Sequence, residues 1–131
     1  MSFVVVSSHE SIHGKDLQQP GDSVAVFSSQ ALAGERYAAR CASLDAAARA
    51  MRDGADDGGS IIWIVLLKLP VPAEDIDEAL ETLEIIVEET DDIAGELDDL
   101  VISYTGTVYA ASGETDYARE RAIDNLHAWL S

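Results

Sequence analysis

The pattern of apolar positions along the chain predicts four or five strands. β-Branched and aromatic residues fill two short segments, residues 3–7 and residues 24–28. Residues 61–69 are apolar at seven consecutive positions, which is typical of a central strand covered on both faces or flanked on both edges. Residues 100–110 predict a further strand, or a pair of strands bent at Gly106. We therefore expect one sheet with residues 61–69 at its centre.

Helical patterns occupy the intervals between these strands. Ser28 or Ser29 can cap a helix that runs through an alanine-rich stretch, with Ser43 able to restart it and Gly54 to end it. Residues 90–99 predict a short helix or turn, and residues 114–130 predict a closing helix. These segments bring the expected number of helices to three or four.

The clearest helical periodicity follows the central strand. Ile76, Leu80, Leu83 and Val87 recur at i, i+4, i+7 and i+11, which predicts a helix with one buried stripe. Pro72 suits the first turn of this helix, because its missing N–H group is not needed there. We therefore expect the helix to run over residues 72–89.

Together these elements predict one α+β domain over residues 1–131. The domain would have two layers, a mainly antiparallel sheet of four or five strands and three or four helices packed against it. Residues 1–69 would form a hairpin–helix–strand half, and residues 70–131 a half made of an acidic helix, a strand and a C-terminal helix. The hydrophobic content of 47% is enough for one core. No apolar run is long enough to span a bilayer, so we expect a cytoplasmic protein with no membrane partner.

Charge changes this picture more than any other property. The chain carries 25 acidic and 8 basic residues, a formal net charge of -17, and one cysteine, which excludes an internal disulfide. Residues 74–99 contain 13 of the acids and no base. Such a chain is repelled by bare nucleic acid and by anionic membranes, so the expected partner is a basic protein.

The acidic segment also has helical spacing. Carboxylates that recur three and four residues apart form rows with neighbours about 5 to 6 Å apart, which can imitate a row of phosphates. We therefore predict a partner-binding face that presents this row to a basic, nucleic-acid-binding protein. In composition the chain resembles phage-encoded nucleic-acid mimics that inhibit restriction or CRISPR machinery. The residues of this predicted face are Glu74, Asp75, Asp77, Glu78, Glu81, Glu84, Glu88, Glu89, Asp91 and Asp92.

Two alternatives remain open for the acidity. Adaptation to high salt would also favour many acids and few lysines, but it predicts acids spread over the whole surface. The other alternative is a solvated helix with an unremarkable function, and a homodimer is also an open possibility for the assembly of the chain. The sequence does not decide between these possibilities.

One short string suggests an enzyme instead. His9-Glu10-Ser11-Ile12-His13 reads H-E-x-x-H, which resembles the zinc-peptidase motif in which a helix places two histidines on one face. Glu35 is the best candidate for a third ligand, and Asp16 and His127 are poorer ones. The alternative is a polar hairpin loop with two exposed histidines, which Gly14 and the preceding strand favour. A minimal zinc metallohydrolase is therefore kept as an alternative function.

No other catalytic pattern is present. The chain has no glycine-rich phosphate loop and no G-x-S-x-G elbow, and its single cysteine, Cys41, has no histidine near it in the sequence. We therefore expect an interaction protein that is not an enzyme, and we assign no catalytic residue, cofactor or metal ligand.

Overall fold

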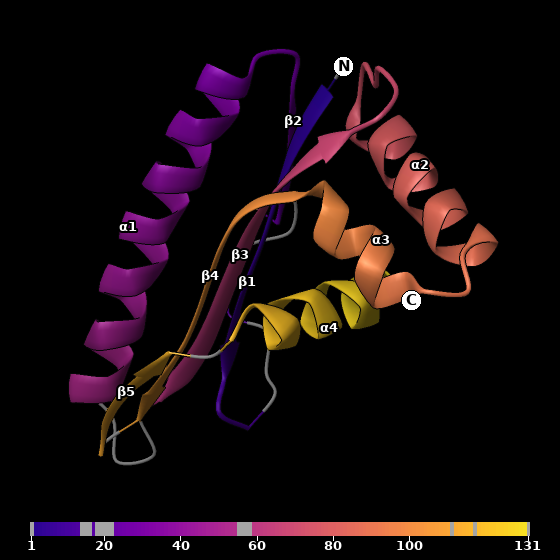
Figure 1. Ribbon diagram of the computed structural model, residues 1–131. Helices are drawn as coiled ribbons and strands as arrows, with labels where there is room; N and C mark the ends of the chain where they lie inside the picture. The colour runs from indigo at the N-terminus through magenta and orange to yellow at the C-terminus, as the bar shows by residue number, and fades with distance from the viewer. Residues whose placement is uncertain are drawn as a thin grey trace.

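A five-stranded antiparallel sheet forms the centre of the molecule (Figure 1). The computed structural model describes residues 2–13, 17, 23–54, 59–110, 112–116 and 118–130. In chain order its elements are β1 (Ser2–Ser11), β2 (Val24–Phe27), α1 (Gln30–Gly54), β3 (Ser60–Leu69), α2 (Ile76–Glu89), α3 (Ile93–Leu100), β4 (Val101–Ala110), β5 (Gly113–Asp116) and α4 (Arg119–Leu130).

The strand order is β2-β1-β3-β4-β5, which places β3 in the middle. β1 and β3 pair over ten positions, from Ser2 opposite Leu69 to Ser11 opposite Ser60. Every neighbouring pair of strands is antiparallel. The predicted central position of residues 61–69 is confirmed, and the unbroken apolar run is explained by neighbours on both edges and helices on both faces.

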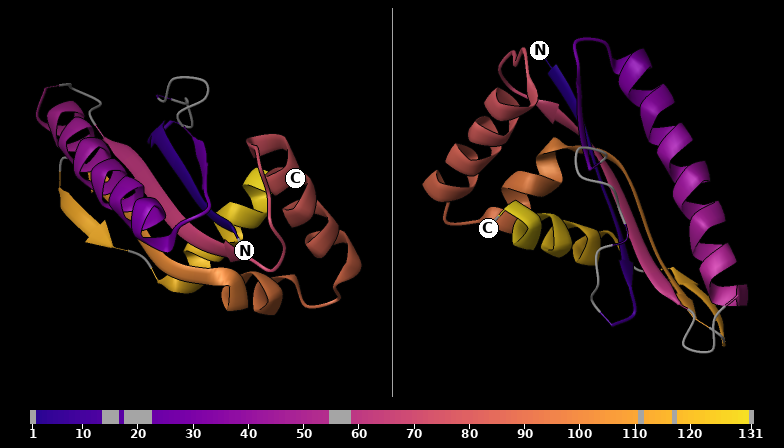
Figure 2. Two further views of the ribbon diagram at one scale, coloured as in Figure 1. Left: turned by 90° about the horizontal axis from the view of Figure 1, so that it is seen from above. Right: turned by 180° about the vertical axis from the view of Figure 1, so that it is seen from behind.

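Helices cover the two faces of the sheet unequally. Figures 1 and 2 show α1 alone along one face and α2, α3 and α4 together on the other. Because side chains alternate along a strand, Phe3 and Val5 face α1, whereas Val4 and Val6 belong to the core under α2–α4. The predicted α+β class, with five strands and four helices, is confirmed.

Side-chain caps determine where α1 and α2 begin. The Ser29 hydroxyl accepts a hydrogen bond from the Leu32 N–H group at 3.4 Å, so Ser29 caps α1, which continues without a break to Gly54. α2 begins at Ile76, not at residue 72, because Asp75 is its cap. This start leaves Ile76 41% exposed, and the fully buried positions of α2 are Ala79 and Leu83. The prediction that Ile76 belongs to the buried stripe of this helix is therefore wrong.

The largest differences from the elements predicted by the sequence are in polar strand segments. β1 continues four residues beyond the predicted end, and residues 113–116 form β5, where a helix was expected to begin. Gly113, the first residue of β5 and the partner of Ala110, has a φ of 131°, a conformation that favours glycine. β4 passes through Gly106 without a break, and its irregularity lies at Ile102 instead, where the register against β3 shifts. No helix of the described residues is long and apolar enough to cross a membrane.

Candidate functional site

The predicted acidic face lies on α2, on the two residues before it and on the segment that joins it to α3. α2 lies at the side of the molecule opposite α1 (Figure 2). All ten predicted side chains are exposed, from Glu74 to Asp92. We call these ten residues the acidic surface. The structure thus places them on one exposed helix and directly beside its two ends, and their role in partner binding stays a prediction.

Four carboxylates of the acidic surface share one face of α2. Asp77, Glu81, Glu84 and Glu88 are spaced by four, three and four residues, which aligns them along the helix. At a rise of about 1.5 Å per residue, the row extends over roughly 16 Å. A single continuous line of negative charge therefore runs along the exposed side of α2.

Three residues of the acidic surface accept hydrogen bonds from backbone N–H groups at the start of a helix. The Asp75 carboxylate accepts a hydrogen bond from the Glu78 N–H group at 2.8 Å, and the Glu78 carboxylate accepts one from the Glu74 N–H group at 2.9 Å. Asp92 caps α3 by accepting a hydrogen bond from the Gly95 N–H group at 3.1 Å. Helix capping thus accounts for these acids, but not for the row from Asp77 to Glu88.

No carboxylate of the acidic surface has a counter-ion among the residues that the structure describes. The nearest contrast is Asp98 in α3, which pairs with Arg119 at 2.5 Å. The last turn of α2 has no basic residue, although Glu88 and Glu89 lie there beside the negative end of the helix dipole. The charge of the acidic surface is therefore left uncompensated, at a cost to the helix.

An apolar side chain lies within the acidic surface. Ile85 is 44% exposed, and its helical neighbours at i−4, i+3 and i+4 are Glu81, Glu88 and Glu89. Ile76, at the start of the helix, is also exposed. Single exposed aliphatic side chains are ordinary on protein surfaces, so Ile85 and Ile76 are not by themselves evidence of a binding surface.

The H-E-x-x-H string does not form a zinc-peptidase helix. His9 and Glu10 lie in β1, so their side chains point to opposite faces of the sheet. His13 follows in the turn after the strand. The alternative of a loop with two exposed histidines is also wrong for His9, which is only 4% exposed. A strand forms here because Ser7 to Ser11 continue the pairing with β3 despite their polarity.

The candidate third ligands are not gathered around the string. Glu35 is exposed on α1, and His127 lies on α4, on the other side of the sheet. Asp16 lies outside the described residues. Among the residues that are described, no group of three or more histidine, cysteine or acidic side chains could hold a metal ion.

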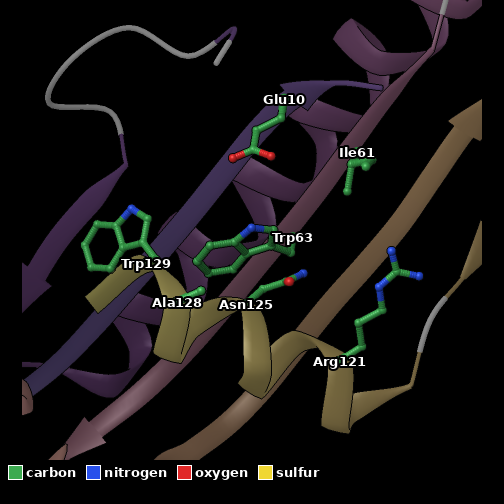
Figure 3. A pocket seen from close by; sticks show the side chains of 7 residues that line it. All are labelled: Glu10, Ile61, Trp63, Arg121, Asn125, Ala128 and Trp129. Atoms are coloured by element: carbon green, nitrogen blue, oxygen red, sulfur yellow. The ribbon is translucent and has the colours of Figure 1, made fainter. Parts of the chain in front are cut away.

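A pocket of about 310 Å³ lies between the sheet and α4 (Figure 3). Its wall from the sheet consists of Glu10, Ile61 and Trp63, and α4 supplies the other wall. The residues from α4 are Arg121, Asn125, Ala128 and Trp129. Sequence reasoning missed this pocket, because its two walls are more than fifty residues apart in the chain. The sequence feature that could have indicated the pocket is that both tryptophans lie on elements expected to face the core.

Polar side chains join α1 to β4 on the opposite face. The hydroxyls of Tyr37 and Thr105 lie 2.6 Å apart, and the Tyr109 hydroxyl donates to the Asp45 carboxylate. Burial raises the pKa of Tyr37 to about 12. Burial, and then the bond to Asp45, raise the pKa of Tyr109 above its usual value, and the same bond lowers the pKa of Asp45. These groups are held neutral or paired, so we interpret the contacts as a structural link.

A cavity of about 290 Å³ adjoins this link. Its lining includes Cys41, Ile62 and Thr107 as well as three of the linked residues, Asp45, Thr105 and Tyr109. The Cys41 sulfur lies 3.5 Å from the Thr105 hydroxyl, and Thr107 donates to Asp116 at 2.9 Å. The polar groups around the cavity thus bond to one another and give no sign of a reactive thiol.

Comparison of the chain with protein-family models, with curated proteins and with solved structures gives no match to any of them. The functional argument therefore depends on the geometry described above.

Proposed function

We propose that this protein is a small interaction protein whose acidic surface binds a basic, nucleic-acid-binding protein in place of nucleic acid. The observation that carries the proposal is the row from Asp77 to Glu88, which is exposed, has no counter-ion among the described residues and lies beside the exposed Ile85. A basic partner would supply the missing cations, and Ile85 would supply an apolar contact. An inhibitor of the phage-encoded anti-restriction or anti-CRISPR kind would act in this way.

The energetics of α2 support a role in binding. Like charges three or four residues apart each destabilise a helix by about 0.2–0.5 kcal/mol. Glu88 and Glu89 add an unfavourable interaction with the end of the helix. A lysine at one of these positions would relieve the repulsion, yet the segment has none. A row of negative charges that destabilises its own helix is expected where a binding partner interacts with those charges.

The distribution of charge favours this proposal over adaptation to high salt. α1 is also long and exposed, but it carries four arginines against three acids, whereas residues 74–99 carry 13 acids and no base. Salt adaptation would place acids on both helices.

The test uses two variants with equal changes of charge. The triple variant Glu81→Gln, Glu84→Gln and Glu88→Gln removes three charges from the acidic row. The control variant Glu35→Gln, Glu120→Gln and Asp124→Asn removes three charges from exposed acids elsewhere. Proteins captured from cell extract on the immobilised wild type at low salt would be purified and tested for binding of a labelled DNA duplex.

We expect a captured DNA-binding protein to release its duplex when the wild type or the control variant is added. The Glu81, Glu84 and Glu88 variant should be weaker by about tenfold or more, and the difference should shrink as salt is raised. Equal competition by the two triple variants would overturn the proposal. So would captured proteins that keep their duplex when the wild type is added.

A further inference from the structure

A cleft of about 390 Å³ lies where the C-terminal ends of α2 and α4 meet. Glu84, Val87 and Glu88 line it from α2, and Leu130 lines it from α4. Figure 2 shows the end of α4 beside α2. We call this feature the α2–α4 cleft. It adjoins one end of the acidic row and is separate from the pocket under Trp63.

The floor of the α2–α4 cleft is apolar and is held in place by the core. Val87 and Leu130 are half-buried, and both pack against the buried cluster that contains Leu83 and Leu126. Each of the two lining residues keeps part of its surface open to the cleft. A floor of this kind can contact the methylene groups of a long side chain whose charged end stays near the rim.

The rim of the cleft is negative for two reasons. Glu84 and Glu88 are exposed, lie one turn apart on the same face of α2 and form no ion pair with any described residue. The last turns of α2 and α4 also add the negative ends of two helix dipoles and carbonyl groups without intrahelical partners. The basic residue in the last turn of α4, His127, does not line the cleft. The rim thus offers acceptors and no cation.

An arginine side chain has the chemistry that complements this cleft. Its methylene groups can lie on Val87 and Leu130, and its guanidinium group can donate to Glu84, to Glu88 and to helix-end carbonyls. Five N–H donors in a planar fork suit several acceptors that lie in different directions. The ammonium group of lysine has three donors and holds its water more strongly. An acidic side chain would be repelled, and an apolar one would leave both carboxylates without a partner.

We propose that the α2–α4 cleft binds an arginine side chain of the basic partner protein. This inference rests on the proposed function, because Glu84 and Glu88 belong to the acidic surface. It goes further by making the acidic row unequal along its length. Glu84 and Glu88 would contact the arginine directly, whereas Asp77 and Glu81 would act only through general attraction.

Three blocked tripeptides probe the cleft in the full chain. Each has alanine at both ends, and the central residue is arginine, lysine or citrulline, which has nearly the shape of arginine without its charge. Titration of the isotope-labelled protein at low salt would be followed by NMR spectroscopy. We expect saturable shifts of the Val87, Glu88 and Leu130 amides with the arginine peptide. The lysine peptide should bind about threefold more weakly, and the citrulline peptide about tenfold more weakly.

Two double variants of α2 remove equal charge from different parts of the row. Glu84→Gln with Glu88→Gln should weaken binding of the arginine peptide about tenfold or more, because both direct contacts are lost. Asp77→Asn with Glu81→Gln removes the same charge outside the cleft and should weaken it about twofold or less. Circular dichroism spectra and melting curves establish that both variants are folded.

A second pair of variants tests the apolar floor. Leu130→Ala removes part of the floor and should weaken binding of the arginine peptide about threefold. Leu32→Ala on α1 removes an aliphatic side chain that is 51% exposed and distant from the cleft, so the affinity should not change.

Three results would overturn this inference. The first is equal binding of the arginine peptide and either of the other two peptides. The second is an equal loss in the two double variants, which would mean diffuse attraction only. The third is a set of shifts that lies outside the cleft. If the wild type still displaces DNA from its captured protein in any of these cases, the proposed function stands without the cleft. If the peptides bind as expected but the captured proteins keep their duplex, the proposed function fails and the arginine site remains.

Discussion

The helices α1 and α2, on opposite faces of the sheet, differ in how their charges are paired. On the α1 face, Arg49 pairs with Asp45 at 2.9 Å and with Glu114 at 2.7 Å, and Arg52 pairs with Glu114 and Asp53. On the other face, α2 carries six acids and forms no ion pair with any described residue. A helix that only covers a sheet can neutralise its charges locally, as α1 does. Binding of a basic partner, as proposed above, would account for this contrast.

The faces also differ in how their helices are held. Small residues such as Ala33 and Ala48 let α1 lie close to the sheet, and its Tyr37 and Asp45 bond to β4 and complete the attachment. Under α2–α4 the core is larger and apolar, with Leu83, Leu97 and Leu126 fully buried. We therefore expect truncation in this core to affect stability most, and changes on the acidic surface to affect it least.

The largest expected effect is that of Leu83→Ala. Leu83 is fully buried between α2 and the sheet, so its truncation should lower the free energy of unfolding by about 2–5 kcal/mol. Urea denaturation measures this change. Leu32→Ala on α1 is the control, because its side chain is 51% exposed and the expected loss is below about 0.5 kcal/mol. Similar losses for the two variants would mean that α2 does not pack as described.

An intermediate effect is expected from alkaline pH on the α1 face. The folded pKa of Tyr37 is raised to about 12 from an ordinary value of 10.0, so the fold favours its neutral form. Its contribution to stability is complete below pH 10 and is lost as the pH rises toward 12. Urea denaturation across this range should show falling stability, and Tyr37→Phe should reduce the slope.

The Tyr37→Phe variant should keep part of the alkaline loss, because the pKa of Tyr109 is raised as well. At neutral pH it should lose about 0.5–1.5 kcal/mol, the usual contribution of one hydrogen bond. Parallel pH profiles for the wild type and the variant would contradict the role given to Tyr37.

The smallest expected effect has the opposite sign. Glu88→Gln removes a negative charge from the last turn of α2, so we expect it to stabilise the protein by about 0.3–1 kcal/mol at low salt. Thermal denaturation at low and high salt measures the gain, which should shrink with screening. Asp77→Asn, near the start of the same helix, is the matched control and should not stabilise. A gain for Asp77→Asn equal to that for Glu88→Gln would show that only net charge matters.

Apolar patterns made most of the fold predictable from the sequence. The run of residues 61–69 placed the central strand, and Ser29 and Gly54 marked the ends of α1. The missed strand segments, residues 8–11 and β5, are polar, and their strand structure depends on pairing with neighbours distant in the chain. Local patterns carry no information about such pairing.

The two candidate sites also differ in whether their residues are close together in the sequence. The acidic surface could be predicted because its residues follow one another along a helix and its linker. The pocket could not, because Trp63 and Trp129 meet only after α4 crosses the sheet. The structure also corrected the H-E-x-x-H string, whose spacing has its chemical meaning only in a helix.

The pairing of β1 with β3 has a consequence for folding during synthesis. Its partners are 49 positions apart at Ser11 and Ser60 and 67 positions apart at Ser2 and Leu69. Contacts of such long range slow folding, since a large loop must close before they form. Until β3 emerges from the ribosome, β2 can cover one edge of the valine-rich β1, and its other edge stays open to association with other nascent chains. We expect ribosome pausing before residue 69 to promote aggregation, and pausing within the later acidic segment to be far less harmful.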